Sequence, residues 1–264
     1  MSSVEFAEEK KRNPTILIPL GSQELQGPQG PMGDYMLSEK MAEEVARRSD
    51  AISAPTIPFG YADVFRSVPG GMQLRPETFL MLLEDCITAF LDHGLARVVL
   101  FNGHTGNAPL IDQLTRRLKR ERGIIIPAIH IWKITPKSLW EELHPGLGEK
   151  AGGHGADPIA SVYHHYFPHL MRPELAEPAT AKSALGLPTI GLSAVDFDGV
   201  PINVPLDATD VHEHGLVGGD ARLSNADKGR AFAEHIIEVT ANFIRHFEKC
   251  DPCEGLLDRI DPIA

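Results

Sequence analysis

The sequence is poor in cysteine, in long apolar runs and in basic residues, and each shortage excludes a class of protein. Its three cysteines among 264 residues provide no disulfide framework, so we expect a reducing compartment, the cytoplasm. No apolar run approaches the roughly 20 residues that a membrane-spanning helix needs. The formal net charge of −11 argues against nucleic acid or an anionic membrane as a partner.

The two ends of the chain lack familiar signals as well. Residues 1–14 are polar and contain no apolar segment, so they are not expected to be a signal peptide and are predicted to form an N-terminal arm. Near the other end, Cys250 and Cys253 form a single CxxC pair. A structural zinc site needs four ligands, and no second pair is present. We therefore expect 250–264 to be a polar tail in which this pair is incidental.

The chain does contain a regular alternation of apolar runs and amphipathic segments. The predicted strands are 15–20, 51–58, 97–101 and 124–131. The predicted helices are 36–48, 76–93, 108–121, 158–167 and 225–249. Such alternation is typical of βαβ units, so it predicts an α/β fold with a mostly parallel central sheet. We take 1–264 as a single domain, interrupted at 168–220 by an irregular excursion, rich in Pro, Gly and Asp, that is expected to be functional or oligomer-forming.

His104 lies where a predicted strand gives way to a predicted helix. Its turn, 101–107 (FNGHTGN), has a glycine on each side of the histidine. These glycines let the backbone turn sharply and leave the imidazole unobstructed. In open α/β sheets this edge is where ligands bind. The alternative is a turn histidine that only caps a helix or bonds to backbone.

A second loop of this kind, 21–34, follows the first predicted strand and contains four glycines and two prolines. It carries Glu24 shortly after the strand, and Asp34 just before the next helix, where an N-cap role is expected. Because the strands are parallel, Glu24 and His104 should converge on one edge of the sheet. A carboxylate and an imidazole there suit a divalent metal, although both also make ordinary hydrogen bonds.

Histidines and acids also gather in two later loops. The glycine-rich turn 151–157 (AGGHGAD) carries His154 and Asp157, which could be site residues or a satisfied loop histidine and an N-cap. An Asp-x-His-x-His pattern ends at His214 in the excursion. A metal patch and a solvated or subunit-contacting acidic loop are both open there.

Taken in order, these pieces resemble the creatininase (creatinine amidohydrolase) family over nearly the whole chain. The turn 102–107 (NGHTGN) is similar to the family's Asn-Gly-His-Gly-Gly-Asn, and 154–157 (HGAD) to its His-Ala-Gly-Glu. Other matching segments are 18–24 (IPLGSQE), 27–28, 31–33, 69–71 (PGG), 75–79 (RPETF), 218–220 (GGD) and 225–229.

The resemblance implies a three-layer αβα domain, assembled as a hexamer of identical subunits. It also implies hydrolysis of C–N bonds in cyclic or linear amides with two divalent metals. One metal would be held by Glu24, a bridging Asp and His104. The other would be held by a His matching Gln26, the same Asp and a further Glu. Family substrates include creatinine, formamido-pyrimidines and short peptides, so the resemblance does not fix the substrate.

Several family ligands are replaced in this chain. Gln26 and Gln29 stand where the family has histidines, and a neutral amide is a poor zinc ligand. The bridging Asp falls at Tyr35, one residue after Asp34. Asp157 replaces the Glu and reaches about 1.5 Å less far, one C–C bond. We therefore expect an altered or single-metal site for Zn, Mn or Fe, built from Glu24 and His104 with Asp34 or Asp157.

Three functions remain open from the sequence. The first is a metal-assisted amide hydrolase in which His154 or Asp157 shuttles the proton. The second is a metal-free lactone or amide hydrolase, or an isomerase, with Glu24 as base. The third is a non-catalytic binding or assembly protein on the same fold.

The expected partners are a small-molecule amide substrate and further copies of the chain, with no nucleic acid and no membrane. In the metal-free alternative, the polar side chains that orient the substrate would be Gln26, Gln29 and Asn102. By the resemblance, Trp140 could be an aromatic lid over the substrate, and a buried packing role is its alternative.

Overall fold

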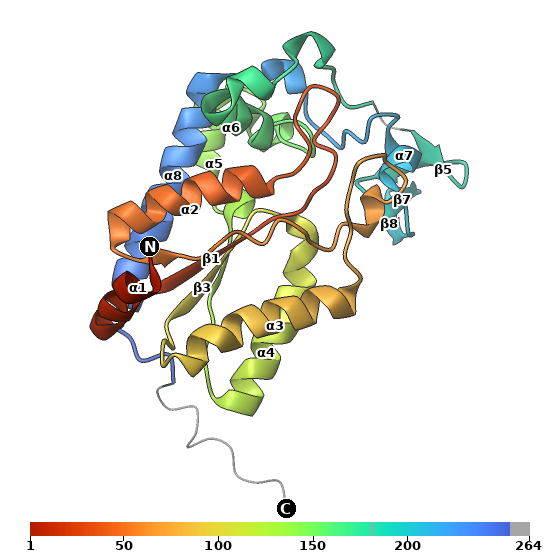
Figure 1. Ribbon diagram of the computed structural model, residues 1–264. Helices are drawn as coiled ribbons and strands as arrows, with labels where there is room; N and C mark the ends of the chain where they lie inside the picture. Colours follow the sequence, from red (N-terminus) through yellow and green to blue (C-terminus); the bar gives the residue numbers. More distant parts are fainter. Residues whose placement is uncertain (181, 254–264) are drawn as a thin grey trace, which may run out of the picture.

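The computed structural model describes residues 1–180 and 182–253. Its centre is a four-stranded parallel sheet in the order β2-β1-β3-β4, which runs through the middle of the molecule (Figure 1). The strands are β1 Ile16–Leu20, β2 Ile52–Ser53, β3 Val98–Asn102 and β4 Ala128–His130. The mostly parallel sheet expected from the sequence is thus confirmed.

Helices cover both faces of this sheet, which makes the three-layer αβα arrangement. The long helices are α2 Tyr35–Ser49, α3 Pro76–Asp92, α4 Ala108–Arg122 and α8 Ala226–Phe247. One core packs α2 and α8 on Leu17, Val99 and Phe101, and the other packs α3 and α4 on alternate residues of the same strands. Figure 1 shows the same division, with α2 on one side of the sheet and α3 and α4 on the other.

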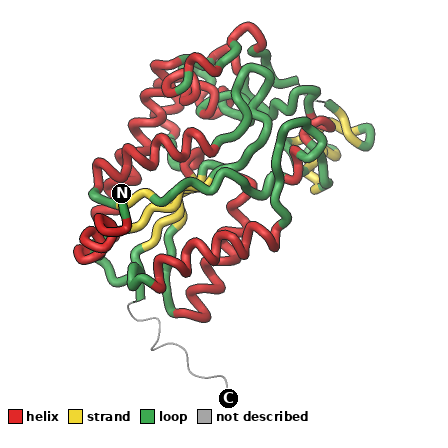
Figure 2. Tube along the Cα trace, viewed as in Figure 1, coloured by secondary structure: helices red, strands yellow, loops and turns green. Residues whose placement is uncertain are grey.

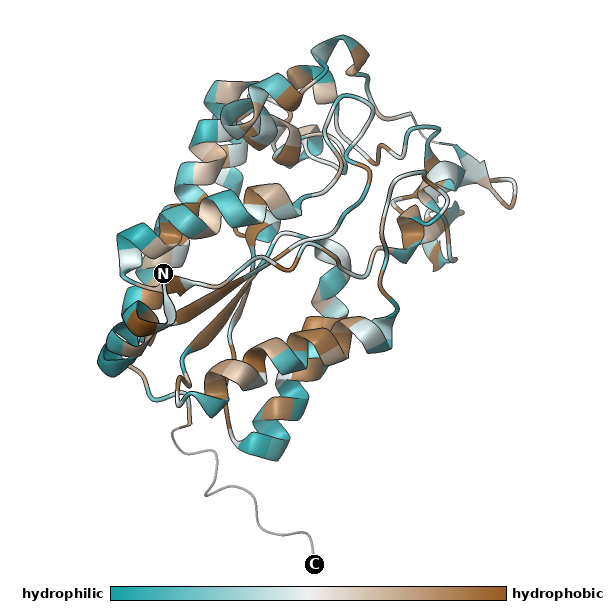
Figure 3. Ribbon diagram, viewed as in Figure 1, coloured by the Kyte–Doolittle hydropathy of each residue, from teal (hydrophilic) through white to brown (hydrophobic). Residues whose placement is uncertain are grey.

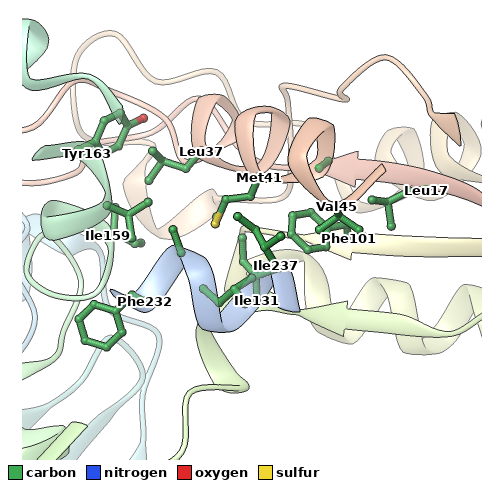
Figure 4. Packing of buried hydrophobic residues seen from close by; sticks show 14 of the residues in the cluster. Leu17, Leu37, Met41, Val45, Phe101, Ile131, Ile159, Tyr163, Phe232 and Ile237 are labelled. Atoms are coloured by element: carbon green, nitrogen blue, oxygen red, sulfur yellow. The ribbon is translucent and has the colours of Figure 1, made fainter. Parts of the chain in front are cut away.

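The two central strands are buried on both faces because helices cover both faces of the sheet. All five positions of β1 and of β3 are buried, as is typical of parallel strands covered by helices. Figure 4 shows part of one core, where strand residues meet helix residues: Leu17, Phe101, Leu37, Met41, Val45 and Ile237. Burial of each such side chain stabilises the fold by about 1.5–3 kcal/mol, so these layers hold the strand ends in place.

The helices begin and end near the residues that the sequence predicts. Pro76 occupies the first turn of α3, Gly123 ends α4 with φ of 62°, and the Asn225 side chain caps α8 by accepting from the N–H of Lys228. The shorter helices are α1 Ser3–Glu9, α5 Lys137–Leu143, α6 Ile159–Tyr166 and α7 Ala208–Val211. Figure 3 shows the central strands mostly brown and the helices with both brown and teal residues, as expected for amphipathic helices that cover an apolar sheet.

The two outer strands are shorter than predicted, and proline is the reason. The segment 51–58 pairs as β2 and then only through a bridge between Leu20 and Ile57, because Pro55 has no N–H to donate. The segment 124–131 pairs only as β4, preceded by Pro127 and followed by a 3-10 turn at Ile131–Lys133.

The excursion 168–220 is less irregular than expected. It contains a second, antiparallel sheet, seen at one end of the molecule in Figure 2. Its strands are β5 Ser183–Ala184, β6 Leu187–Ile190, β7 Ala194–Phe197 and β8 Val200–Asn203. Asp198 and Gly199, with φ of 52° and 80°, form the Asp-Gly turn that suits a two-residue hairpin. Strands of two to four residues are too short to show the alternation on which a sequence prediction depends.

The predicted arm at the N-terminus is in part the helix α1. Of the predicted tail, 254–264 lies outside the described residues. Among the described residues, no helix combines the length and the apolar character needed to cross a membrane.

Candidate functional site

Glu24, Asp34 and His104 meet at the carboxyl end of the central sheet. Glu24 follows β1 and His104 follows β3, and these two strands are paired in register, with Leu20 opposite Asn102. Nδ1 of His104 lies 3.0 Å from Oε2 of Glu24 and 3.0 Å from Oδ2 of Asp34. The predicted meeting of Glu24 and His104 in one cleft is therefore confirmed.

Asp34 occupies the N-cap position of α2, but the capping role expected for its side chain is wrong. Its backbone is helical, with φ of −87° and ψ of −11°, and its side chain makes no capping bond to α2. One carboxylate oxygen instead accepts from the N–H of Ser22 at 2.6 Å, and the other faces His104. Asp34 is thus turned into the cleft, next to a second carboxylate.

Glycine makes room for the imidazole, as the sequence suggests. A Cβ on Gly106 would lie 2.4 Å from Nε2 of His104, and one on Gly103 would lie 1.9 Å from Oγ of Ser38. Both separations are far inside van der Waals contact, so neither position accepts a side chain without rearrangement. Glycine at 106 is therefore required by packing on His104, and glycine at 103 by packing on Ser38.

The protonation of His104 is constrained by its neighbours. Nε2 lies 3.0 Å from the carbonyl oxygen of Tyr61 and donates to it. In the neutral ring, Nδ1 would then present a lone pair to two carboxylate oxygens. Glu24 Oε2 is buried and has no hydrogen-bond partner among the described residues. The cluster therefore requires either a proton among these atoms, on the imidazole or on a carboxylate, or a bound cation in its place.

The pKa shifts point the same way. Burial lowers the pKa of His104, but the charges of Glu24 and Asp34 outweigh it and hold that pKa well above its ordinary value. Burial raises the pKa of Asp34 to about 7; His104 opposes this shift and the charge of Glu24 adds to it. With exposed fractions of 2%, 1% and 4% for Glu24, Asp34 and His104, water does little to screen these charges.

The same three side chains fit a divalent cation. Each offers one ligand atom, and these atoms lie within 4.8 Å of one another. Neighbouring ligands around an ion with bonds of about 2.1 Å lie about 3 Å apart, as the Nδ1–oxygen distances here do. Two carboxylates and an imidazole suit zinc, manganese or iron.

A cavity of about 810 Å³ opens beside this cluster. Glu24, Asp34 and His104 contribute to its wall, together with His154 and Asp157. Much of the remaining wall is apolar: Val64, Phe65, Trp132, Trp140, Leu192 and Val217. Trp140 lines the cavity and also packs in the core, where the centroid of its ring lies 4.9 Å from the centroid of the Phe232 ring.

His154 is held in a neutral form that exposes one basic nitrogen. Its Nε2 donates to the carbonyl oxygen of Leu25 at 2.7 Å, and its ring stacks on Phe65 at 4.4 Å. Burial lowers the pKa of His154. Since Nε2 carries the hydrogen, Nδ1 keeps its lone pair. The backbone of His154 is fixed by two hydrogen bonds to Val217.

Asp157 is not brought into the Glu24 cluster. One of its oxygens accepts from Nε2 of His144 at 2.8 Å, and the other accepts from Ser161 and Ser224. Burial raises the pKa of Asp157, but these donors outweigh it and lower that pKa below its ordinary value. Nothing in the local sequence marks His144 or Ser224 as its partners, so sequence reasoning missed them.

The three amides expected to orient a substrate hold loops together instead. Asn102 donates to the carbonyl oxygen of His104 at 2.7 Å, Gln26 donates to Oε1 of Glu24 at 3.2 Å, and Gln29 donates to Gly155. In the part of the chain that the structure describes, none of the three lines the cavity. The carbonyl oxygen of Tyr61, which sequence reasoning overlooked, orients His104.

Curated proteins with similar sequences are hydrolases by name. A 3-dehydro-scyllo-inosose hydrolase of Thermotoga maritima is 34% identical over 106 residues, 39% of this chain and 34% of its own length. A creatinine amidohydrolase of Pseudomonas putida is 28% identical over 132 residues, 48% of this chain and 50% of its own. The chain thus spans half or less of the length of these relatives.

Solved creatininases share the fold over nearly their whole length. One described as creatinine amidohydrolase (creatininase) superposes with a TM-score of 0.76 at 23% identity, covering 95% of this chain and 97% of that one. A manganese creatininase gives 0.77 at 22% identity with the same coverage. The model of the Creatininase family, described as creatinine amidohydrolase, matches residues 1–244. This chain therefore belongs to the creatininase family.

Proposed function

We propose that this chain is a hydrolase for a C–N bond of a small cyclic or linear amide, assisted by one divalent cation. Glu24, Asp34 and His104 would hold the cation. The observation that carries the proposal is the buried Oε2 of Glu24, which has no hydrogen-bond partner in the described chain yet lies 3.0 Å from Nδ1 of His104. A cation satisfies all three groups at once.

A bound divalent cation supplies Lewis acidity, which polarises a carbonyl group and makes water a stronger acid. The residues of the chain supply the rest. Tyr61 fixes the ring of His104 through Nε2, so that Nδ1 faces the carboxylates. Ser22 fixes Asp34 through its N–H. The apolar wall formed by Phe65, Trp132 and their neighbours excludes bulk water and so strengthens each electrostatic contact.

Two observations support a single cation in this cleft. Gln26 replaces a second-metal histidine and gives its amide hydrogen to Glu24. Asp157, which stands at the position of the remaining family ligand, has both oxygens occupied by donors. A second cation would have to displace these hydrogen bonds.

His154 is the proposed proton acceptor. It lines the cavity with Glu24, and the charge of Glu24 is near enough to raise its pKa partway back after burial has lowered it. Its hydrogen-bonded Nε2 fixes the ring while the unprotonated Nδ1 remains basic. A positioned base of this kind contributes about 10²–10⁴-fold to a rate.

The amide class follows from the family description, and the named relatives differ in substrate. The cavity, about 810 Å³, has the size of small-molecule sites in general. Assembly as a hexamer and a cytoplasmic location stay predictions.

A metal-free enzyme with Glu24 as base is the second candidate. The unpartnered Oε2 of Glu24 favours it. Against it, the expected orienting side chains Gln26, Gln29 and Asn102 do not line the cavity within the described chain. A non-catalytic protein gains no support from a cavity whose wall includes Glu24, Asp34, Asp157, His104 and His154.

Elemental analysis after metal-replete growth and dialysis tests the proposal. Wild type should retain one Zn, Mn or Fe per chain, Glu24→Gln should retain none, and Glu149→Gln should retain one. Glu149 is the matched control because it also lines the cavity but lies outside the cluster. Absence of a retained ion in wild type overturns the metal-assisted function. If wild type without a retained ion still hydrolyses members of a small-amide panel, and Glu24→Gln does not, the metal-free enzyme is favoured.

A further inference from the structure

A second group of side chains with the chemistry of metal ligands lies in the excursion, outside the cavity wall. Its members are Glu177, His212 and His214, and one ligand atom of each lies within 4.8 Å of the others. His212 is the C-cap residue of α7 and is 5% exposed. The side chains of His214 and Glu177 are 48% and 36% exposed, so an ion can reach the group from solvent.

We propose that Glu177, His212 and His214 form a binding site for a transition-metal cation of the zinc class. Two imidazoles and one carboxylate are a donor set that zinc and its neighbours prefer, whereas calcium and magnesium take oxygen ligands. The acidic residues Asp207, Asp210 and Glu213 lie in the same stretch of chain and add attraction for a cation.

A cation would replace hydrogen bonds that these side chains make in its absence. Nδ1 of His212 carries no hydrogen, and its lone pair accepts from the backbone N–H of His214 at 3.1 Å, a bond that a cation on Nδ1 would displace. Nδ1 of His214 lies 2.6 Å from Oε1 of Glu177. A cation would take the place of the hydrogen in this contact, and in the neutral ring that hydrogen moves to Nε2.

The ion would join two segments, of which the second reaches the cavity wall. Glu177 lies in the first, 177–179, whose backbone pairs with residues just after the second segment, through the N–H of Ala179 to the carbonyl oxygen of Gly219 and the N–H of Ala221 to that of Glu177. The two histidines begin the segment 212–217, which ends at Val217 in the cavity wall.

The segment 212–217 rests directly on the site loops. A Cβ on Gly215 would lie 2.3 Å from Cδ2 of Leu25, which shows how closely this turn packs on the residue after Glu24. Leu216 is in similar contact with Gly155, and Val217 pairs with the backbone of His154. An ion bound by Glu177, His212 and His214 would therefore stiffen the support of Glu24 and His154 without touching substrate.

Zinc binding by the full chain, measured by equilibrium dialysis at micromolar free Zn²⁺, tests the proposal. Wild type should bind one ion more than His214→Asn. Glu177→Gln, which keeps an oxygen toward His214, should weaken the same event. His169→Asn and Cys250→Ser should leave it unchanged, which excludes a stray surface histidine or the CxxC pair. Circular dichroism verifies that each variant is folded.

The variant His104→Asn distinguishes this site from the cluster of Glu24, Asp34 and His104. It should lose the dialysis-resistant ion and still bind the additional Zn²⁺. Hydrogen exchange of residues 207–217 should slow with Zn²⁺ in wild type and not in His214→Asn. Equal Zn²⁺ binding by wild type and His214→Asn, or loss of the additional ion in His104→Asn, overturns the proposal.

Discussion

Asp34 and Asp157 are alike in almost every local respect, yet their environments shift their pKa values in opposite directions. Each is 1% exposed, lines the cavity, precedes a helix and lies beside a histidine. Burial raises the pKa of Asp34 to about 7. At Asp157 burial acts in the same direction, but hydrogen bonds from His144, Ser161 and Ser224 outweigh it and the pKa falls.

The difference lies in the number of donors that each carboxylate faces. Asp157 accepts hydrogen bonds from both serines and from His144, so its charge is compensated by the chain itself. Asp34 has the N–H of Ser22 and a histidine that it shares with Glu24, a like charge. A buried carboxylate with too few hydrogen-bond donors indicates a functional site, whereas one with enough donors indicates a structural role.

Asp34→Asn should produce the largest effect. The retained cation should be lost, and hydrolysis should fall at least about 100-fold, because several kcal/mol of charge stabilisation disappear. The thermal stability of the metal-free protein should stay equal or rise, since the amide can still accept from Ser22 and can donate to His104. Elemental analysis, turnover and calorimetry after chelation measure the three outcomes. If Asp34→Asn lowered the stability of the metal-free protein as much as Asp157→Asn does, the two carboxylates would not differ in role.

His154→Gln should lower kcat by about 10²–10⁴-fold while leaving the retained cation in place. The glutamine amide can keep the hydrogen bond to Leu25 but has no basic nitrogen. His130→Gln is the matched control, because His130 lies at the end of β4 and is not among the cavity residues of the described chain. Unchanged kcat in His154→Gln would remove the histidine from the reaction.

Asp157→Asn should lower the free energy of unfolding by about 1–3 kcal/mol. An amide NH₂ would face either the N–H of His144 or the serine donors, and one hydrogen bond must be lost. Denaturant titration measures this change. The exposed Asp227→Asn, with a side chain that is 93% accessible, is the control and should change stability little. A retained cation in Asp157→Asn would place this residue outside the metal site, while its loss would make it a ligand.

The pH dependence of that stability difference has a definite sign. The pKa of Asp157 is lower in the folded chain than the value of about 3.9 expected after unfolding. Its contribution is therefore complete above about pH 4 and is lost as the pH falls through the folded pKa. The stability gap between wild type and Asp157→Asn should stay constant from neutral pH to about pH 5 and close below about pH 4.

Sequence reasoning located Glu24 and His104 because their convergence depends only on sheet topology. Both follow central strands of one parallel sheet, and an apolar run is sufficient to predict each strand. Asp34 could not be placed in this way. Its local sequence is that of an N-cap, and its turn into the cleft depends on the backbone at Gly33, with φ of 99°, and on the distant N–H of Ser22.

The roles of Asp157 and of the excursion depend on contacts that no local pattern records. Ser224 donates to Asp157 across 67 positions and Gln29 to Gly155 across 126. The strands of the antiparallel sheet are short, and their hairpin turns are the main local signal. Periodicity identifies layers and strand ends, whereas the pairing of polar side chains across loops requires coordinates.

Gln26→His should produce the smallest effect. It tests whether Asp157, whose charge is compensated by hydrogen bonds within the chain, can act as a metal ligand. It restores one histidine of the second metal position that the family resemblance implies. We expect the retained metal to stay at one ion per chain, because Asp157 remains bound to His144, Ser161 and Ser224. Elemental analysis after dialysis measures the count. Two retained ions would show that a carboxylate with four hydrogen bonds can still be recruited as a ligand, and that Gln26 alone keeps the site single.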